Sequence, residues 1–172
     1  DDLDTSIKYF EKAKKLNPDA SRVYFNLGLV FDKKKEINLA IINYQKVIEL
    51  DPNNSHAFFN LGSLYQEIYD MEKAEQNLKK CLDLNPNFIN AFINLFSLYD
   101  RSNQLKKYSE LLEKAKKILT EKELIGFYSG MHEYKKKNYK GSIEILENIN
   151  LNESYFIQNI AKYGILAKCY DH

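Results

Sequence analysis

Three asparagines stand at equal spacing in this chain of 172 residues, because Asn26, Asn60 and Asn94 are each separated by 34 positions. A side-chain amide carries N–H donors and a carbonyl acceptor, so it can pair with both polar groups of a peptide backbone. Aligned on one surface, the three would form a ladder that holds an extended peptide by its main chain. The alternative is that asparagine is common in this chain and suits a solvated helix face.

No motif of a catalytic or metal site accompanies the asparagines. The sequence has no glycine-rich phosphate loop and no GxSxG nucleophile elbow. His132 and Glu133 begin like the HExxH motif of zinc proteases, but Lys136 stands where the second histidine is required. The two cysteines, Cys81 and Cys169, have no CxxC or Cys/His neighbours that would bind zinc. We therefore expect no enzyme activity, no metal and no cofactor in this segment.

The polypeptide between the asparagines reads as pairs of helices. Apolar residues recur at intervals of three and four, which is typical of amphipathic helices. The segments LNPDAS, LDPNNS and LNPNF end one helix and begin the next, because proline cannot continue a helix and the Asp or Asn after it can accept free backbone N–H groups. Each pair is therefore predicted to be antiparallel, with helices over roughly 20–33 and 37–50, then 54–68 and 71–84.

A glycine recurs inside the first helix of each pair. Laying one 34-residue unit over the next pairs Gly28 with Gly62 and Ala40 with Ala74. Because glycine inside a helix costs about 1 kcal/mol relative to alanine, a packing gain must offset it. We predict that the glycine and the alanine of a unit lie where its two helices cross, so that the backbones approach closely.

The third unit departs from this pattern. Phe96 stands at its glycine position and Tyr108 at its alanine position. Both small residues of one crossing are therefore replaced together. We predict that the two helices of this unit are splayed apart.

These features together resemble the tetratricopeptide repeat (TPR), a 34-residue helix–turn–helix unit. The matching residues in the second unit are Phe58, Leu61, Gly62, Tyr65, Ala74, Cys81 and Pro86, with Leu78 in place of the second aromatic residue. The resemblance implies an all-α fold, namely a TPR solenoid of antiparallel helix pairs in a right-handed superhelix.

The repeat predicts one TPR array over residues 1–172. Its expected parts are the second helix of an incomplete unit (1–20), two units (21–54 and 55–88), two divergent units (89–122 and 123–156) and the first helix of an incomplete unit (157–172). Terminal repeats normally carry polar caps, and neither end of this chain does. We therefore expect a piece of a longer protein, with self-association through the incomplete terminal repeats as the alternative.

The resemblance also implies which residues line a binding groove, because first helices form the inner surface of TPR arrays. Similar asparagine ladders occur in TPR arms that grip extended peptides, including that of the O-GlcNAc transferase family. The expected groove residues are Arg22, Phe25, Asn26, His56, Phe59, Asn60, Asn90, Asn94, Arg101, Tyr128 and Lys135. Of the cationic clamp that chaperone-binding TPRs use for a carboxylate, only Asn60 matches, so that activity is not expected.

The expected function is a non-catalytic scaffold that holds a protein or peptide partner, as an extended segment or a helix, on its concave face. The alternative is a recognition arm of a larger enzyme. The closing segments KNYKGSIEILENI and ILAKCYDH resemble arms of bacterial sulfotransferase-like proteins, and similar arms precede glycosyltransferase domains. In that case the catalytic domain would lie outside this chain.

Composition supports a folded cytoplasmic protein rather than a membrane protein. Apolar residues make up 44% and charged residues 28% of the chain, which is typical of globular domains. No run is long enough to span a bilayer, and no signal peptide opens the chain. Residues 101–140 hold 11 Lys or Arg against 5 Asp or Glu, a local excess of +6. We interpret this stretch as a solvated lysine-rich face, not as a nucleic-acid site.

Overall fold

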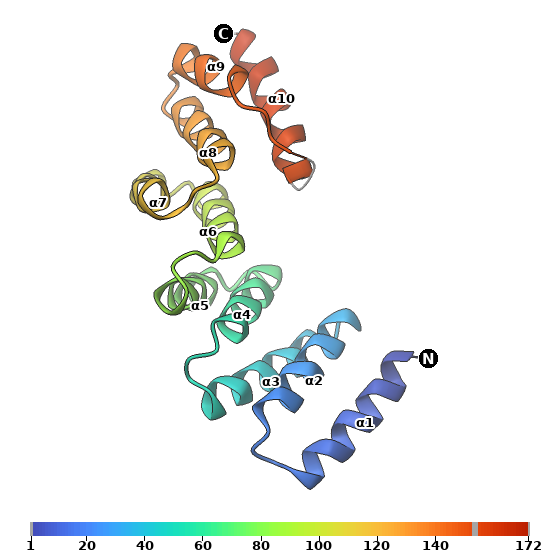
Figure 1. Cartoon of the computed structure of the whole chain (residues 1–172). Helices are drawn as coiled ribbons and strands as arrows, with labels where there is room; N and C mark the ends of the chain where they lie inside the picture. The colour runs from blue at the N-terminus through green and yellow to red at the C-terminus, as the bar shows by residue number, and fades with distance from the viewer. Residues whose placement is uncertain (1, 153–154, 172) are drawn as a thin grey trace. The chain divides into compact units, whose positions relative to one another are not determined.

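The structure is a computed structural model that describes residues 2–152 and 155–171, apart from the side chain of Phe156. Every regular element in these residues is a helix, which confirms the all-α prediction (Figure 1). The helices are α1 (Asp2–Leu16), α2 (Ser21–Lys33), α3 (Ile37–Leu50), α4 (Ser55–Glu67), α5 (Met71–Leu84), α6 (Ile89–Arg101), α7 (Leu105–Ile118), α8 (Lys122–Lys135), α9 (Tyr139–Glu147) and α10 (Phe156–Tyr170).

The chain divides into two compact units, Asp1–Asn94 and Leu95–His172, with the division inside α6. In the first unit, α2 packs on α3 and α4 on α5, while α1 contacts α2 and α3 contacts α4. In the second unit, α8 packs on α9, α7 contacts α8, and α10 contacts both α8 and α9. The division of the sequence into 34-residue repeats stays a prediction.

Side-chain caps begin several of the helices. Asn54, in the LDPNNS segment, accepts a hydrogen bond from the Ala57 N–H, as predicted for the residues that follow proline. Asp70 caps α5 in the same way through the Lys73 N–H. The LNPDAS segment differs, because Ala20 occupies the cap position of α2 and makes no side-chain hydrogen bond.

The turn inside each helix pair has one backbone shape. Lys35, Tyr69, Asn103 and Lys137 have φ values of 62°, 61°, 53° and 62°, in the left-handed region. The next residue then donates to a carbonyl five positions back, as from the Glu36 N–H to the Phe31 oxygen at 2.9 Å. This Schellman motif satisfies carbonyls that the end of a helix leaves free.

Gly28 and Gly62 lie at close helix–helix approaches, as predicted. A β-carbon on Gly28 would lie 2.7 Å from Cε1 of Tyr44, and one on Gly62 would lie 2.7 Å from Cγ of Leu78. Tyr44 and Leu78 belong to the second helices and are fully buried. In each unit the side chain nearest to the glycine is therefore the one four positions after the buried alanine. This is Tyr44 after Ala40, and Leu78 after Ala74.

In the second unit, large rings fill the place of the small residues. Phe96 and Tyr108 are each 1% exposed, and their ring centroids lie 4.9 Å apart. Tyr128 stacks on Phe96 with centroids 4.0 Å apart, and the Tyr108 hydroxyl donates to the Tyr128 carbonyl oxygen at 3.1 Å. The rings therefore form a packed aromatic cluster, and the splaying of α6 from α7 stays a prediction.

Candidate functional site

The three asparagines of the predicted ladder lie on three different helices. Asn26 lies on α2, Asn60 on α4 and Asn94 on α6, and all three are half-buried. All three also belong to the first compact unit, which ends at Asn94. The three side chains therefore recur at one repeat position on three helices of that unit, and their place on a common surface stays a prediction.

Two of the amides reach back toward the preceding helix pair. The Asn94 Nδ2 donates to the Ser63 Oγ at 2.9 Å. Burial raises the pKa of the Tyr44 phenol, and the Asn60 amide opposes that rise from nearby, although no hydrogen bond of normal geometry joins the two groups. Asn26 makes no side-chain hydrogen bond within the described residues. Each amide thus keeps donor or acceptor capacity that a ligand could use.

Aromatic residues precede two of these asparagines in the sequence. Phe25 meets the Tyr44 ring edge to face, with centroids 5.6 Å apart, and Phe59 stacks on Phe88 at 4.9 Å. His56 packs against the same Phe88 ring, with centroids 5.1 Å apart. Phe25 and Phe59 remain half-buried, so part of each ring is available for apolar contact. Phe88 follows a proline turn and gave no signal in the helical pattern.

The Tyr44 hydroxyl is a buried polar group without a hydrogen-bond partner among the described residues. Burial raises the pKa of this phenol well above its usual value, and the nearby Asp32 raises it further. The phenol therefore stays protonated and can donate. An unsatisfied buried polar group costs about 1–3 kcal/mol, so a bound polar group that reached it would be stabilised.

The remaining predicted groove residues differ in accessibility. Arg22 and Asn90 are exposed in the first unit, and Arg101 is exposed in the second. Lys135, also in the second unit, forms an ion pair with Asp100 at 2.6 Å. Tyr128 is only 6% exposed, and burial raises the pKa of its phenol to about 12. In this structure the Tyr128 ring packs in the aromatic cluster and is not open to a peptide.

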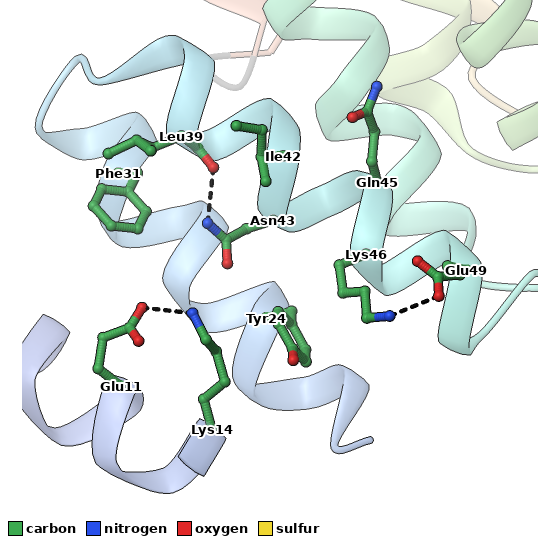
Figure 2. Close-up of a pocket in the computed structure, with 10 residues that line it drawn as sticks. All are labelled: Glu11, Lys14, Tyr24, Phe31, Leu39, Ile42, Asn43, Gln45, Lys46 and Glu49. Carbon is green, nitrogen blue, oxygen red and sulfur yellow. Dashed lines mark hydrogen bonds and ion pairs between the residues drawn. The ribbon is translucent and has the colours of Figure 1, made fainter. Parts of the chain in front are cut away.

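A separate hollow of about 500 Å³ lies between α1, α2 and α3 (Figure 2). It is lined by Glu11, Lys14, Tyr24, Phe31, Leu39, Ile42, Asn43, Gln45, Lys46 and Glu49. The charged groups at its rim are paired with each other, Lys14 with Glu11 at 2.9 Å and Lys46 with Glu49 at 2.6 Å. Each charged group that lines the hollow is therefore paired with another on its own helix.

One cluster in the second unit has the residue types of a nucleophile, a base and an acid. Ser109 Oγ lies 2.6 Å from Nε2 of His132, and Glu133 Oε1 lies 3.6 Å from Nδ1 of the same ring. The serine hydroxyl also lies 3.0 Å from the Leu105 carbonyl oxygen, the expected acceptor for its single proton. All these residues lie inside helices, where backbone N–H groups are used by the helix and cannot form an oxyanion hole. The geometry therefore supports no acyl-transfer chemistry.

The described residues contain neither a metal-binding cluster nor a membrane-spanning helix. Within residues 2–152 and 155–171, no group of three or more His, Cys, Asp or Glu side chains is placed to hold a metal ion. Over the same residues, no helix is both long enough and apolar enough to cross a bilayer. Cys81 is free and buried, and burial raises the pKa of its thiol to about 12, so it is a poor nucleophile.

Models of the family described as tetratricopeptide repeat match three stretches of the chain, residues 1–20, 21–54 and 43–76. Among proteins with curated functions, none matches the chain significantly.

Several solved structures have a similar fold. MamA aligns with a TM-score of 0.74 and 23% identity over 97% of this chain and 92% of its own. YrrB, described as a TPR protein with an unusual peptide-binding site, aligns with a TM-score of 0.67 and 20% identity over 80% of this chain and 71% of its own. A tetratricopeptide repeat protein from Parabacteroides merdae gives a TM-score of 0.81 and 20% identity over 98% and 66%. At such low identity the likeness shows the fold alone.

Proposed function

Because this chain belongs to the tetratricopeptide-repeat family, a fold that typically serves as a non-catalytic protein-interaction scaffold, we propose that its first unit binds an extended peptide by the main chain. The proposed binding face is the one that α2, α4 and α6 present, which we take as the concave face. The observation that carries the proposal is the equal register of Asn26, Asn60 and Asn94 on these helices, each half-buried.

The polar groups of this face suit main-chain recognition. An extended strand presents an N–H and a carbonyl oxygen at every residue, and an amide can accept from one and donate to the other. Asn26 has both groups free within the described residues. Asn94 uses one N–H on Ser63, so its second N–H and its oxygen remain available. The Ser63 contact would hold the Asn94 amide in place before a peptide binds.

The half-buried rings would add apolar contact without reading a particular sequence. Phe25 and Phe59 precede Asn26 and Asn60 by one residue, and each is held against a second ring. A ring that is fixed before binding loses little conformational entropy when the ligand arrives. The first unit of this chain would in this way accept many peptides. YrrB, which has the same fold, is described as having a peptide-binding site.

The test is binding to an array of random unstructured peptides, read in parallel with the same sequences carrying methylated backbone nitrogens. We expect the chain to bind a subset of the peptides and to lose at least roughly tenfold in affinity when the backbone N–H groups are methylated. The triple variant Asn26→Ala, Asn60→Ala, Asn94→Ala should lose a similar factor, because each lost hydrogen bond is worth about 0.5–1.5 kcal/mol.

A matched control is the triple alanine variant of Asn38, Asn53 and Asn87, three exposed asparagines of the same unit. It should bind the peptides as the unmodified chain does. Unchanged binding by the ladder variant would show that the asparagines serve the packing of neighbouring helix pairs instead.

The proposed partner is a protein or peptide, and the proposed location is the cytoplasm, where the free thiols of Cys81 and Cys169 would stay reduced. A recognition arm of a larger sulfotransferase- or glycosyltransferase-type enzyme would use the same face to deliver substrates. The mass of the natural gene product separates the two, because an arm requires a product much larger than the 20.2 kDa of this chain.

A further inference from the structure

The outer face of α3 carries apolar residues where the next two units carry polar ones. Leu39 and Ile42 are 41% and 59% exposed. At the same repeat positions stand Lys73 with Gln76, and then Lys107 with Glu110. Because α3 is an internal helix that packs on both α2 and α4, the exposed apolar pair is a property of this helix and not of an end of the chain.

The two side chains border the hollow of about 500 Å³ between α1, α2 and α3 (Figure 2). The rings of Tyr24 and Phe31 line the same hollow. The Tyr24 hydroxyl is already engaged, since it donates to the Pro18 carbonyl oxygen at 2.9 Å. The walls are therefore mainly apolar, and their size and chemistry suit a ring-sized apolar group.

One polar group of the hollow has an unused acceptor. Asn43 is 7% exposed, and its Nδ2 donates to the Leu39 carbonyl oxygen at 2.8 Å. This bond fixes the amide, and its Oδ1 faces the hollow without a hydrogen-bond partner in the part of the chain that the structure describes (Figure 2). A carbonyl oxygen can only accept. A group that fills the hollow must therefore bring a donor to this oxygen.

The same amide on α5 has a different surrounding. Asn77 follows Asn43 by 34 residues, and its Nδ2 donates to the Lys73 carbonyl oxygen at 2.8 Å. Lys73 and Gln76 beside it are exposed polar residues, and Asn77 is half-buried. A hydrogen bond sheltered by apolar groups is stronger than one in water. Of the two amides, Asn43 is thus the one at which a ligand gains more from pairing with the oxygen.

We propose that this hollow is a docking site for a tryptophan side chain of a partner protein. An indole brings a flat apolar body for the walls and a single N–H that donates to the Asn43 oxygen. A phenylalanine ring would leave that oxygen without a donor. Lys14 and Lys46 also line the hollow, and the electron-rich face of an indole attracts cations. Lys14 Nζ already lies 5.8 Å from the centre of the Tyr24 ring.

The test is binding of the peptide N-acetyl-Ala-Ala-Trp-Ala-Ala-amide, followed by its indole fluorescence, because the chain contains no tryptophan. Two comparison peptides, measured by competition, carry phenylalanine or a tryptophan methylated on the indole nitrogen. Each should bind roughly three- to tenfold more weakly, since each lacks the hydrogen bond to Asn43. Main-chain binding is common to all three peptides, so the differences between them report on the hollow alone.

Three variants locate these differences on α3. Leu39→Lys combined with Ile42→Gln gives α3 the residues of α5 and should abolish the preference for tryptophan over phenylalanine. Asn43→Leu should abolish the preference for tryptophan over its methylated form. Asn77→Leu, the matched change on α5, should leave both preferences as they are in the unmodified chain.

The site is independent of the predicted asparagine ladder, so the triple alanine variant of Asn26, Asn60 and Asn94 should keep both preferences. Absence of binding by the tryptophan peptide, equal binding of all three peptides, or a preference that survives Leu39→Lys with Ile42→Gln would overturn the proposal. Free indole that binds as tightly as the peptide would also overturn it, because the hollow would then take a small molecule instead of a partner's side chain.

Discussion

Two regions of the molecule pack the same repeat positions in different ways. At Gly28 and Gly62 the first unit omits a side chain, and a large residue of the second helix lies directly on the backbone. At Phe96 the second unit places a ring there, which packs between Tyr108 and Tyr128. Both solutions exclude water, since Leu78 is fully buried and Phe96 is 1% exposed. This repeat position therefore forms a buried packing contact in both units, but the side chains that form the contact differ.

The two solutions have different weak points. A glycine crossing is sensitive to added atoms, because a β-carbon would lie less than 3.0 Å from a buried side chain of the second helix. An aromatic cluster fails when atoms are removed, because the remaining rings lose their contact surface. The second unit also keeps one glycine crossing, Gly130 against Leu146, so the change is local to α6 and α7.

The largest effect is expected from Phe96→Ala. The ring is fully buried against two others, so its loss should lower the free energy of unfolding by about 3–5 kcal/mol. Urea unfolding followed by far-ultraviolet circular dichroism measures this, with Ser97→Ala on the exposed side of α6 as the control. A loss below about 1 kcal/mol, the usual size of surface changes, would mean that the cluster does not hold α6 in place.

A smaller effect, which changes sign, is expected from Gly62→Ala. Its β-carbon would lie 2.7 Å from Leu78 Cγ and 3.2 Å from the Leu78 backbone nitrogen. Overpacking of this kind costs about 1–3 kcal/mol, more than the roughly 1 kcal/mol that alanine gains in helix propensity. In a Leu78→Ala background the collision with the side chain is removed and only the 3.2 Å approach to the backbone nitrogen remains, which a shift of a few tenths of an ångström would relieve, so the same substitution should become stabilising. A double-mutant cycle measured by urea unfolding gives the change in unfolding free energy caused by Gly62→Ala in each background. Destabilisation of similar size in both backgrounds would show that Leu78 is not what excludes a β-carbon at this crossing.

The smallest effect concerns pH and the edge of the aromatic cluster. His132 stacks on Tyr108 with centroids 5.8 Å apart, and burial, assisted by Lys136, lowers the pKa of its imidazole. The folded chain then binds this proton less tightly than the unfolded chain, so stability is lost as pH falls below about 6.5. The urea midpoint should therefore drop between pH 7.5 and 5.5 by more in the unmodified chain than in His132→Gln. Equal drops would assign the pH dependence to other groups.

Much of the helical framework could be predicted from the sequence, because helix periodicity and proline turns are local signals. The ranges 37–50 and 71–84 agree with α3 and α5. The neighbours that packing brings together could not be predicted in the same way. Tyr128 occupies a groove position in the repeat, yet it is buried because Phe96 presents a flat ring to it. Nothing in the spacing of either residue indicates that stack.

The candidate site shows the same limit. The register of Asn26, Asn60 and Asn94 is visible in the sequence as a spacing of 34. The contact of Asn94 with Ser63, and the unpartnered hydroxyl of Tyr44, depend on side chains from neighbouring helices. Such contacts depend on where helices sit in three dimensions, which a periodic pattern does not specify.

The left-handed turn residues have a consequence for how such a chain can change. Lys35, Tyr69, Asn103 and Lys137 are spaced by 34 residues without exception, and Asn103 holds its place in the very unit that has lost its glycine. The left-handed turn thus recurs every 34 residues, even in the unit where Phe96 replaces the glycine. Recombination between any two of these turns would join residues of similar left-handed conformation. Whole repeats could then be gained or lost at these points while the helices on either side stay in step.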